Sequence, residues 1–395
     1  MAVVVQDSLR DTVDALCAIE RGSATEGERA AAELIAERFR GAGLEPVVDE
    51  EPALGRGFWW PLGLMSLAGA AAGLAALRGQ RALGALLGLA AGAGIADDLE
   101  NGPRVFRRLV MPRRRTWNVT AVTGDPDASR TVVVLAHHDA PYSGLVFSQD
   151  LQRLVDEHTG LVERTDTAVP VFFPVVAGPL LVALGSVLRR AGLVRAGTVL
   201  ATGSVAAFAD IAARGPVPAA NDNASGVACL VALAERLRDE PVSGVRVVLA
   251  SCGSEESFQQ GVRAWARRWF PRLPRDRTWV LNMETVGSPE LALLEGEGTL
   301  HMQDYQAGFK DQVDAWAREV GIPLRRKLRS RTSTDAVIPH RAGYPTANFV
   351  SVTRWKALAN YHWPSDVPEN VDFGTVAQAT EVAATVIRRL ASEAT

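Results

Sequence analysis

The sequence predicts an α/β fold, in which a mixed, mostly parallel central sheet is flanked by helices and carries two inserted hydrophobic helical hairpins. First, helix-like and strand-like segments alternate regularly after residue 226, a pattern typical of parallel sheets. Second, the segment Thr131–Ala136 is apolar throughout, as expected of a central strand that is covered on both faces. Third, two long uncharged segments interrupt the alternation, so each is predicted to be an insertion.

The N-terminal part is predicted to form helical structure followed by strands. Apolar residues recur at helical spacing from Ser8 to Gly43, where Thr25 and Glu28 match a capping box. Leu44–Glu50 then has the character of a strand. Trp117–Val122 is a further strand, joined to Thr131–Ala136 by a loop rich in Gly, Asp and Pro.

The C-terminal part supplies the regular alternation. Helices are expected at residues 227–238, 261–270, 308–320 and 375–390, and strands at 245–251, 278–283 and 346–352. The strands are rich in Val, Leu and Met and the helices repeat apolar residues every three to four positions. This order places several strand ends at one edge of the predicted sheet.

Two hydrophobic hairpins interrupt this pattern. In the first, residues 58–96, an uncharged segment from Phe58 to Leu77 is followed by an arginine-containing turn and a second apolar segment, Ala82–Ala96. The second, residues 167–209, has the same form. About 20 apolar residues cross a bilayer core of ~30 Å. The hairpins are therefore predicted to be a membrane anchor, with a buried lid or a dimer contact in a soluble protein as the alternative.

The hairpins divide the remaining domain into three parts, residues 1–57, 97–166 and 210–395. Because each hairpin returns to the side that it leaves, these parts must share one side of any membrane. No secretory signal peptide is visible at Met1–Arg10, and arginines beside the domain outnumber those in the two tips. The positive-inside rule thus favours a membrane protein whose domain is cytoplasmic, and a soluble cytoplasmic protein is the alternative.

Composition excludes some partners and bonds. The formal net charge is -3, from 42 basic and 45 acidic residues, so no nucleic-acid-binding signature is present. Cys17, Cys229 and Cys252 are scattered and lack C-x-x-C spacing. A disulfide framework is therefore not expected, and a reducing compartment is preferred.

Histidines and acidic residues stand at the ends of the apolar, strand-like segments. They are His137 and Asp139, the pair Glu255 and Glu256, and Glu284, with His362 near the end of another such segment. Asp222 lies within Asn221–Gly226, directly before a predicted helix. Active sites of open α/β sheets collect at the carboxyl ends of the strands. Nitrogen and oxygen ligands with a spare carboxylate suggest a pair of divalent metals with a catalytic base.

Each of these residues also has a structural interpretation. Asp222 precedes a helix and could be an N-cap. Glu255 and Glu256 could be a solvated pair, although two adjacent carboxylates after an apolar strand repel each other unless a cation is near. His137 could be a packed histidine, but Asp139 lies on the same side of an extended chain, where a carboxylate orients a metal-bound imidazole. The histidines without supporting partners are interpreted as packed or exposed: His138, His158, His301 and His340.

The ordered motifs resemble peptidase family 28, the zinc metallopeptidases that include co-catalytic aminopeptidases and relatives such as glutaminyl cyclases. The motifs are His137-x-Asp139, Asn221–Gly226, Glu255-Glu256, Asn282–Gly287 and Tyr361-His362. The resemblance covers roughly residues 10–55 and 116–390, and it implies a zinc-aminopeptidase-like fold.

The resemblance also implies a ligand set for two zinc ions. Asp222 would bridge the ions, His137 and Glu284 would hold one, and Glu256 and His362 would hold the other. The same carry-over makes Glu255 the general base, with Asp139 orienting His137. Asp335 would lie near the substrate, and Tyr361 is a weaker candidate for stabilising the carbonyl.

The resemblance implies hydrolysis of a peptide bond by a hydroxide that two zinc ions share. Family members suggest that the bond is the one that releases the N-terminal residue. Two features depart from the family pattern: Glu284 stands where Asp is common, and the second hairpin separates His137 from Asp222. The alternatives are a single-zinc cyclase and a non-catalytic, receptor-like relative. Retention of all the ligands and of Glu255 argues against the latter. The preferred side chain and the oligomeric state are not predicted.

Overall fold

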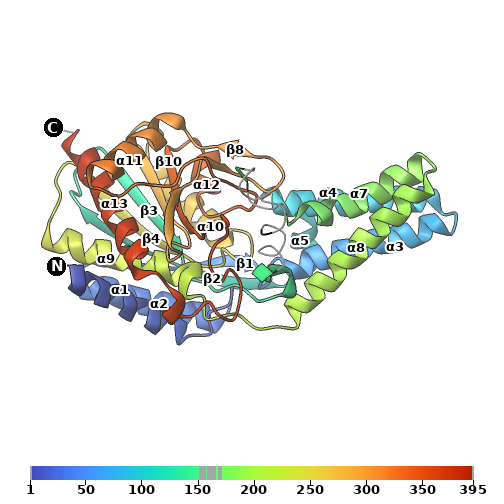
Figure 1. The fold of residues 1–395 in the computed structure, drawn as a ribbon, viewed down its shortest axis with the longest axis horizontal. Helices are drawn as coiled ribbons and strands as arrows, with labels where there is room; N and C mark the ends of the chain where they lie inside the picture. The colour runs from blue at the N-terminus through green and yellow to red at the C-terminus, as the bar shows by residue number, and fades with distance from the viewer. Residues whose placement is uncertain (1, 151–156, 158–165, 168–170, 394–395) are drawn as a thin grey trace.

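The structure, a computed structural model, describes residues 2–150, 157, 166–167 and 171–393, with side chains from residue 7 onward. It consists of an α/β body, which contains both ends of the chain, and a long helical arm that extends from one side of the body (Figure 1). Of the second predicted hairpin, residues 168–170 lie outside the described part.

The body is built on a seven-stranded sheet in the order β1-β2-β4-β3-β5-β10-β6. The four adjacent strands β4, β3, β5 and β10 are parallel, and β1, β2 and β6 add antiparallel edges. The predicted mixed, mostly parallel central sheet is therefore confirmed. The strand bounds are β1 (Val47–Leu54), β2 (Arg113–Gly124), β3 (Thr131–His137), β4 (Arg246–Cys252), β5 (Thr278–Met283), β6 (Glu290–Leu293) and β10 (Thr346–Val352).

Helices cover both faces of this sheet, which explains why β3 is apolar at every position. Val132 and Val134 belong to a core that they share with one layer of helices, whereas Val133 and Leu135 pack into a second core on the opposite face. The first layer consists of α1 (Ala2–Cys17), α2 (Glu26–Gly41), α9 (Ser225–Asp239), α11 (Ala307–Glu319) and α13 (Phe373–Ser392). The second contains α10 (Gln260–Trp269) and α12 (Val337–Arg341).

The N-terminal helical segment forms two helices, because the chain turns between α1 and α2. Thr25 is the N-cap of α2, and its side-chain oxygen accepts a hydrogen bond from the Glu28 amide at 3.3 Å. The Glu28 carboxylate accepts one from the Ala24 amide at 2.8 Å, one residue before the N-cap. It is also bonded to Thr116 and Ser254, so the cap joins α2 to the sheet.

The two hydrophobic insertions form a single arm. Its helices are α3 (Trp59–Leu77), α4 (Arg81–Leu99), α7 (Phe173–Val187) and α8 (Ala191–Ala212). Helix α3 packs against the other three, so the predicted hairpins combine into one bundle. Glycines allow this close approach. A Cβ atom added to Gly197 of α8 would lie 2.5 Å from the Gly178 carbonyl oxygen of α7.

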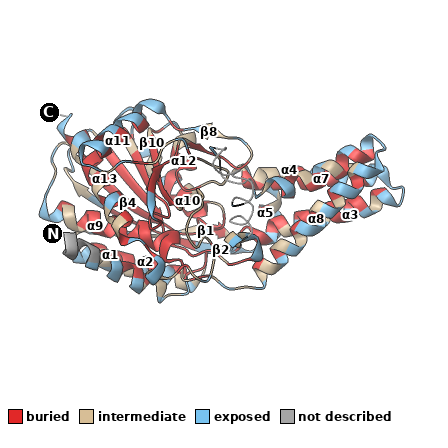
Figure 2. Ribbon diagram, in the orientation of Figure 1, coloured by how far each residue is buried: buried red, intermediate tan, exposed pale blue. Residues whose placement is uncertain are grey.

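Many residues of the arm are exposed (Figure 2), and large apolar side chains are among them. Leu86, Val187 and Val199 are 69%, 68% and 70% exposed. Helices α3, α4 and α8 are long and apolar enough to cross a membrane, and α7 is a shorter apolar helix. The turns at the far end of the arm carry exposed arginines: Arg78, Arg81, Arg189, Arg190 and Arg195.

A buried ion pair secures the arm to the body. The Asp98 carboxylate at the end of α4 accepts hydrogen bonds from Nε and Nη2 of Arg107, each at 2.8 Å. Arg107 belongs to the short helix α5 (Val105–Val110) and also donates to the Ser257 carbonyl at 3.2 Å. The segment after α4 is thus bonded to the loop that follows β4.

Candidate metal centre

The predicted ligands meet at the carboxyl ends of the parallel strands. His137 is the last residue of β3, and Glu284 directly follows β5. Glu256 lies in the loop after β4, Asp222 lies in the turn before α9, and His362 lies in the loop before α13. All are buried. Alternating helices and strands bring these distant residues together because parallel strands end at the same edge.

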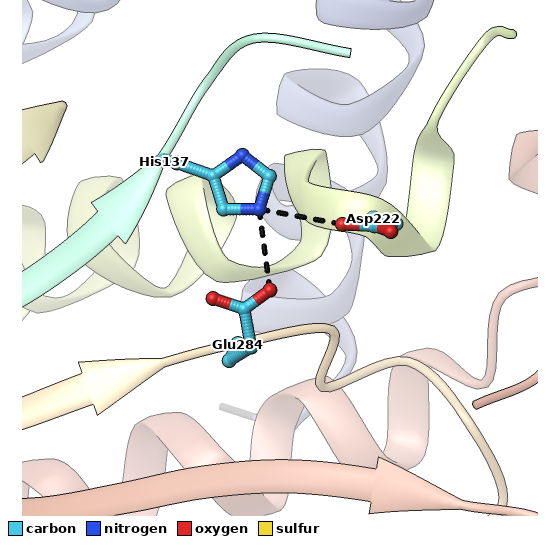
Figure 3. Close-up of side chains that lie close together, drawn as sticks. All are labelled: His137, Asp222 and Glu284. Atoms are coloured by element: carbon cyan, nitrogen blue, oxygen red, sulfur yellow. Dashed lines mark hydrogen bonds and ion pairs between the residues drawn. The ribbon is translucent and has the colours of Figure 1, made fainter. Parts of the chain in front are cut away.

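The ligand atoms form two groups that share Asp222. In the first, His137 Nε2 lies 3.3 Å from Asp222 Oδ1 and 3.2 Å from Glu284 Oε1 (Figure 3). In the second, His362 Nε2 lies 3.4 Å from Asp222 Oδ2 and 3.4 Å from Glu256 Oε2. Each oxygen of the Asp222 carboxylate therefore faces a different group.

These spacings fit tetrahedral zinc. Bond lengths of ~2.0–2.1 Å to nitrogen and oxygen require neighbouring ligands to lie ~3.3 Å apart. In addition, Asp222 Oδ2 is buried and accepts no hydrogen bond from the described residues. A carboxylate oxygen in that state needs a cation. Each triad of ligand atoms could hold a metal ion: His137, Asp222 and Glu284, or Asp222, Glu256 and His362.

The electrostatics of the cluster also call for positive charge. Burial raises the pKa of Glu255 well above its usual value, although the neighbouring His137 opposes this shift. Burial, together with the charge of Asp222, raises the pKa of Glu256 in the same direction. For Asp222, burial alone would raise the pKa, but the close approach of His137 and His362 outweighs burial and lowers it. Divalent cations would offset the repulsion among these carboxylates.

Asp139 links the two sides of the cluster. Its carboxylate lies 3.5 Å from His137 Nδ1 and accepts hydrogen bonds from the Glu255 and Glu256 amides at 2.9 and 3.1 Å. Ser23 donates to it at 2.6 Å. The Asp139 carboxylate therefore lies beside the His137 ring, whose Nδ1 is 3.2 Å from the Asp139 main-chain carbonyl oxygen, and it also fixes the turn that presents the glutamate pair.

Asp366 supports Asp222 and was not identified from the sequence. Its carboxylate accepts hydrogen bonds from the amides of Asn221 at 2.7 Å and Asp222 at 3.0 Å. Burial raises the pKa of Asp366 to about 7. Asp366 and Asp222 are 144 residues apart, so their contact could not be predicted from local sequence. The one indication is that Asp366 lies four residues after His362, in the same described loop.

Gln259 supports Glu255 and was also not assigned a role. Its Nε2 donates to Glu255 Oε1 at 2.6 Å and to the Ser333 carbonyl at 2.8 Å. Asn101, just after α4, donates to Gln259 Oε1 at 2.8 Å, and Arg104 donates to Asn101 Oδ1 at 2.5 Å. We call Arg104, Asn101 and Gln259 the base-support chain. It connects the end of α4, where the arm joins the body, to Glu255.

The remaining residues considered in the sequence analysis differ in their burial and in their contacts. Asp335 is buried, and neither of its carboxylate oxygens has a hydrogen-bond partner among the described residues. The Tyr361 ring packs on His362 with centroids 3.9 Å apart. His138 Nδ1 instead bonds to Ser251 at 2.9 Å. His301 is exposed, His340 is half-buried beside Tyr305, and His158 lies outside the described residues.

A cavity of about 200 Å³ opens beside the ligands. Its polar floor includes Asp222 and the two glutamates after β4, whereas its wall contains aromatic rings. Phe58 and Phe172, which precede α3 and α7, pack with ring centroids 5.8 Å apart, and Phe258 stacks on Phe58 at 5.2 Å. The arm therefore contributes part of the wall of this cavity.

Comparison with known proteins shows a family match in the C-terminal part of the chain. Residues 204–387 match the profile of Peptidase family M28. No curated protein sequence matches the chain. Similar solved structures include a Bacteroides thetaiotaomicron glutaminyl cyclase bound to N-acetylhistamine, with a TM-score of 0.57, 12% identity, and 97% of each chain covered.

Two aminopeptidase structures are also similar. BSAP, a zinc aminopeptidase from Bacillus subtilis, has a TM-score of 0.56 at 14% identity and covers 96% of this chain and 94% of its own. An aminopeptidase from Aneurinibacillus sp. strain AM-1 has a TM-score of 0.52 at 13% identity, with coverage of 96% and 93%. At these identities the structures establish the shared fold.

The profile match contains most of the ligand cluster, including Asp222, Glu256, Glu284 and His362, while His137 lies before it. It supports a zinc-dependent enzyme of the hydrolase or cyclase class. The resemblance drawn from the ordered motifs is confirmed by the match of residues 204–387 to Peptidase family M28.

Proposed function

We propose that this protein is a zinc aminopeptidase that holds two zinc ions and uses Glu255 as its general base. The observation that carries this proposal is the position of Asp222, whose two carboxylate oxygens face two separate groups of ligands. A bridging carboxylate is suited to a pair of ions. A single-zinc site would leave one of these groups, with its buried carboxylates, uncompensated.

The ligands would be distributed over the two sites as their contacts suggest. His137 and Glu284 would hold one ion, Glu256 and His362 the other, and Asp222 both. Zinc in these sites would lower the pKa of a bound water towards ~7 and polarise the scissile carbonyl. Asp139 keeps the His137 ring in the orientation that ligation requires.

Glu255 is placed to transfer the proton. Gln259 holds one of its carboxylate oxygens at 2.6 Å, and the second oxygen can accept a proton from water and return it to the leaving amine. Glu255 lines the cavity together with Glu284 and His362, so the base and the ligands face the same space. Tyr361 also lines this cavity and could donate to the carbonyl oxygen.

The cavity wall suggests the class of substrate. The rings of Phe58, Phe147, Phe172 and Phe258 surround the approach to the ligands. Burial of an apolar side chain contributes ~1.5–3 kcal/mol to binding, whereas a charged side chain would be desolvated there. We therefore expect peptides with large apolar N-terminal residues to be preferred over those with acidic or basic ones.

The test combines metal analysis with a panel of peptides. Purified protein should contain two zinc ions per chain and release the first residue of peptides with a free N-terminus, but leave N-acetylated peptides intact. One zinc ion, with loss of ammonia from glutaminyl peptides, would instead establish a cyclase. Full metal content without reaction on either substrate class would point to a receptor-like role.

We further propose that the arm is a membrane anchor and that residues 1–57, 97–166 and 210–395 form a cytoplasmic catalytic domain. Three features of the arm support its role as an anchor, whereas the cytoplasmic orientation rests on the larger number of arginines beside the domain. Large apolar side chains are exposed on the surface of the arm, its helices contact each other closely at glycines such as Gly178 and Gly197, and its far end carries arginines. Small residues at helix contacts and basic residues at helix ends are both typical of membrane-spanning bundles.

Fractionation and labelling test the anchor and its orientation separately. The full-length protein should remain in the membrane fraction until detergent is added, and recovery of a monodisperse soluble protein would refute the anchor. For orientation, cysteines are introduced at Gln80 and Gly192 in the tips and, as a control, at Asp127 on the body, in a Cys17→Ser background. Impermeant reagents should label the two tips from outside the cell but not Asp127→Cys.

A further inference from the structure

A cleft lined by arginines lies at the foot of the arm. Its volume is about 700 Å³, and no acidic residue is among the described residues that line it. The arginines come from α5, from the start of β2 and from α10. We call this feature the arginine cleft and define it by Arg104, Arg108, Arg113, Arg114, Arg263 and Arg267.

Much of this positive charge is uncompensated. Within the described part of the chain, no ion pair or hydrogen bond involves the side chains of Arg108, Arg113, Arg114 or Arg267. Burial lowers the pKa of Arg263, and the nearby charges of Arg267 and Arg108 lower it further. Like charges around one cavity repel each other, and a bound anion would relieve that repulsion.

The surroundings of the cleft are those of a membrane interface. Helix α5 packs against α3 and α4, so the cleft lies where the arm joins the body. Leu109 on α5 is 79% exposed and directly follows Arg107 and Arg108 in the sequence. Trp60, in the first turn of α3 at the body end of the arm, is 56% exposed. Exposed Leu and Trp beside basic residues are typical of the boundary between lipid headgroups and acyl chains.

We propose that the arginine cleft binds the phosphate headgroup of an anionic phospholipid in the membrane that holds the arm. This inference rests on the membrane placement proposed above, but not on the peptidase activity. Guanidinium groups bind phosphate oxygens in pairs of parallel hydrogen bonds. Clusters of four to eight basic residues beside membrane-spanning helices are a common site for anionic lipids.

The shape of the cleft favours a lipid over an extended polyanion. Pro52 and Leu54 form part of the lining, so the arginines surround a partly apolar hollow instead of a continuous basic stripe. An acyl chain could leave this hollow along the exposed apolar side chains of α5. A free phosphate compound would use the arginines but gain nothing from the apolar surface.

The test uses the full-length protein purified in a mild non-ionic detergent. It is titrated with short-chain phosphatidylglycerol, with phosphatidylcholine of the same chain length, and with glycerol 3-phosphate, while binding is followed by native mass spectrometry. The cleft variant is Arg108→Gln/Arg114→Gln/Arg267→Gln. The matched control, Arg78→Gln/Arg81→Gln/Arg190→Gln, loses the same charge at the opposite end of the arm.

Phosphatidylglycerol should bind more tightly than either of the other ligands, and the cleft variant should lose that preference. Each basic residue beside an anionic surface strengthens binding about five-fold, so removing three predicts about 100-fold weaker binding. The control should bind within about two-fold of the unmodified protein. Circular dichroism and zinc content that match the unmodified protein would show that the cleft variant is folded.

Several outcomes would overturn the proposal. Equal binding of the two lipids, or an equal loss in the cleft variant and the control, would remove the site. Equal affinity for glycerol 3-phosphate and phosphatidylglycerol would assign the cleft to a soluble anion. Because binding is measured without a peptide substrate, failure here leaves the peptidase proposal intact, and fractionation tests the anchor independently.

Discussion

Replacing Glu255 by Gln separates the transfer of the proton from the binding of metal. The amide has nearly the same shape, and its oxygen can still accept the hydrogen bond that Gln259 donates at 2.6 Å. It cannot take a proton from water. General-base catalysis contributes ~10² to 10⁴ in rate, or ~2.7–5.4 kcal/mol, so kcat should fall at least ~100-fold while zinc content stays constant.

The assay is release of the N-terminal residue from the best peptide of the panel, with zinc measured on the same sample. Glu256→Gln is the matched comparison, because it makes the same replacement of a carboxylate by an amide at the adjacent residue. That variant should lose one zinc ion, since Glu256 Oε2 faces His362 in the second ligand group. Near-normal turnover by Glu255→Gln would refute the role of Glu255 and show that another group accepts the proton.

Four further predictions follow from named contacts. Asp222→Ala should remove both zinc ions, because this carboxylate serves both groups, and retention of two ions per chain would contradict the bridge. Asp98→Ala should destabilise the protein by ~3–5 kcal/mol in urea unfolding, since it leaves the buried Arg107 unpaired. Gly197→Val should lower the melting temperature in detergent, because its Cβ would approach the Gly178 oxygen at 2.5 Å, whereas Gly192→Val, where no atom lies within 4 Å, should not. Burial raises the pKa of Glu297 from 4.5 to about 8, so its neutral form stabilises the fold at low pH and this stability, up to ~5 kcal/mol, is lost progressively as the pH rises from about 4.5 to about 8. Melting curves of Glu297→Gln should lack this part of the pH dependence, and an unchanged profile would show that Glu297 is ionised throughout.

The central sheet could be predicted because its signal is local and repeated. The continuous apolar run at Val132–Leu135 indicated burial on both faces, and alternate residues indeed enter two different cores. The ligand cluster could be predicted from the sequence for a related reason. His137, Glu256 and Glu284 lie at or just after the ends of parallel strands, and the rule that such strands end at one edge of a sheet predicts that these residues lie close together. Asp222 and His362 instead lie in loops that precede helices.

Other features depend on pairings that the local sequence does not encode. The two hairpins were visible as apolar segments, but their union into one bundle depends on contacts such as that between Gly178 and Gly197. The bond from Gln259 to Glu255 depends on a loop in which Gln259 adopts a positive φ of 55°. The single helical pattern from Ser8 to Gly43 likewise contained a turn that the apolar spacing did not reveal.

If the proposed function holds, the base-support chain would make peptide hydrolysis depend on assembly of the arm. Asn101 and Arg104 follow α4 directly, and both adopt positive φ values that the surrounding packing must maintain. A chain whose hairpins are replaced by short linkers would retain every zinc ligand and Asn101, yet Asn101, which donates to Gln259, would no longer be positioned by the end of α4. Such a shortened protein should bind zinc normally and hydrolyse peptides slowly. A newly made chain would then gain full activity only after its arm is in place, so that unassembled copies would not degrade peptides elsewhere in the cell.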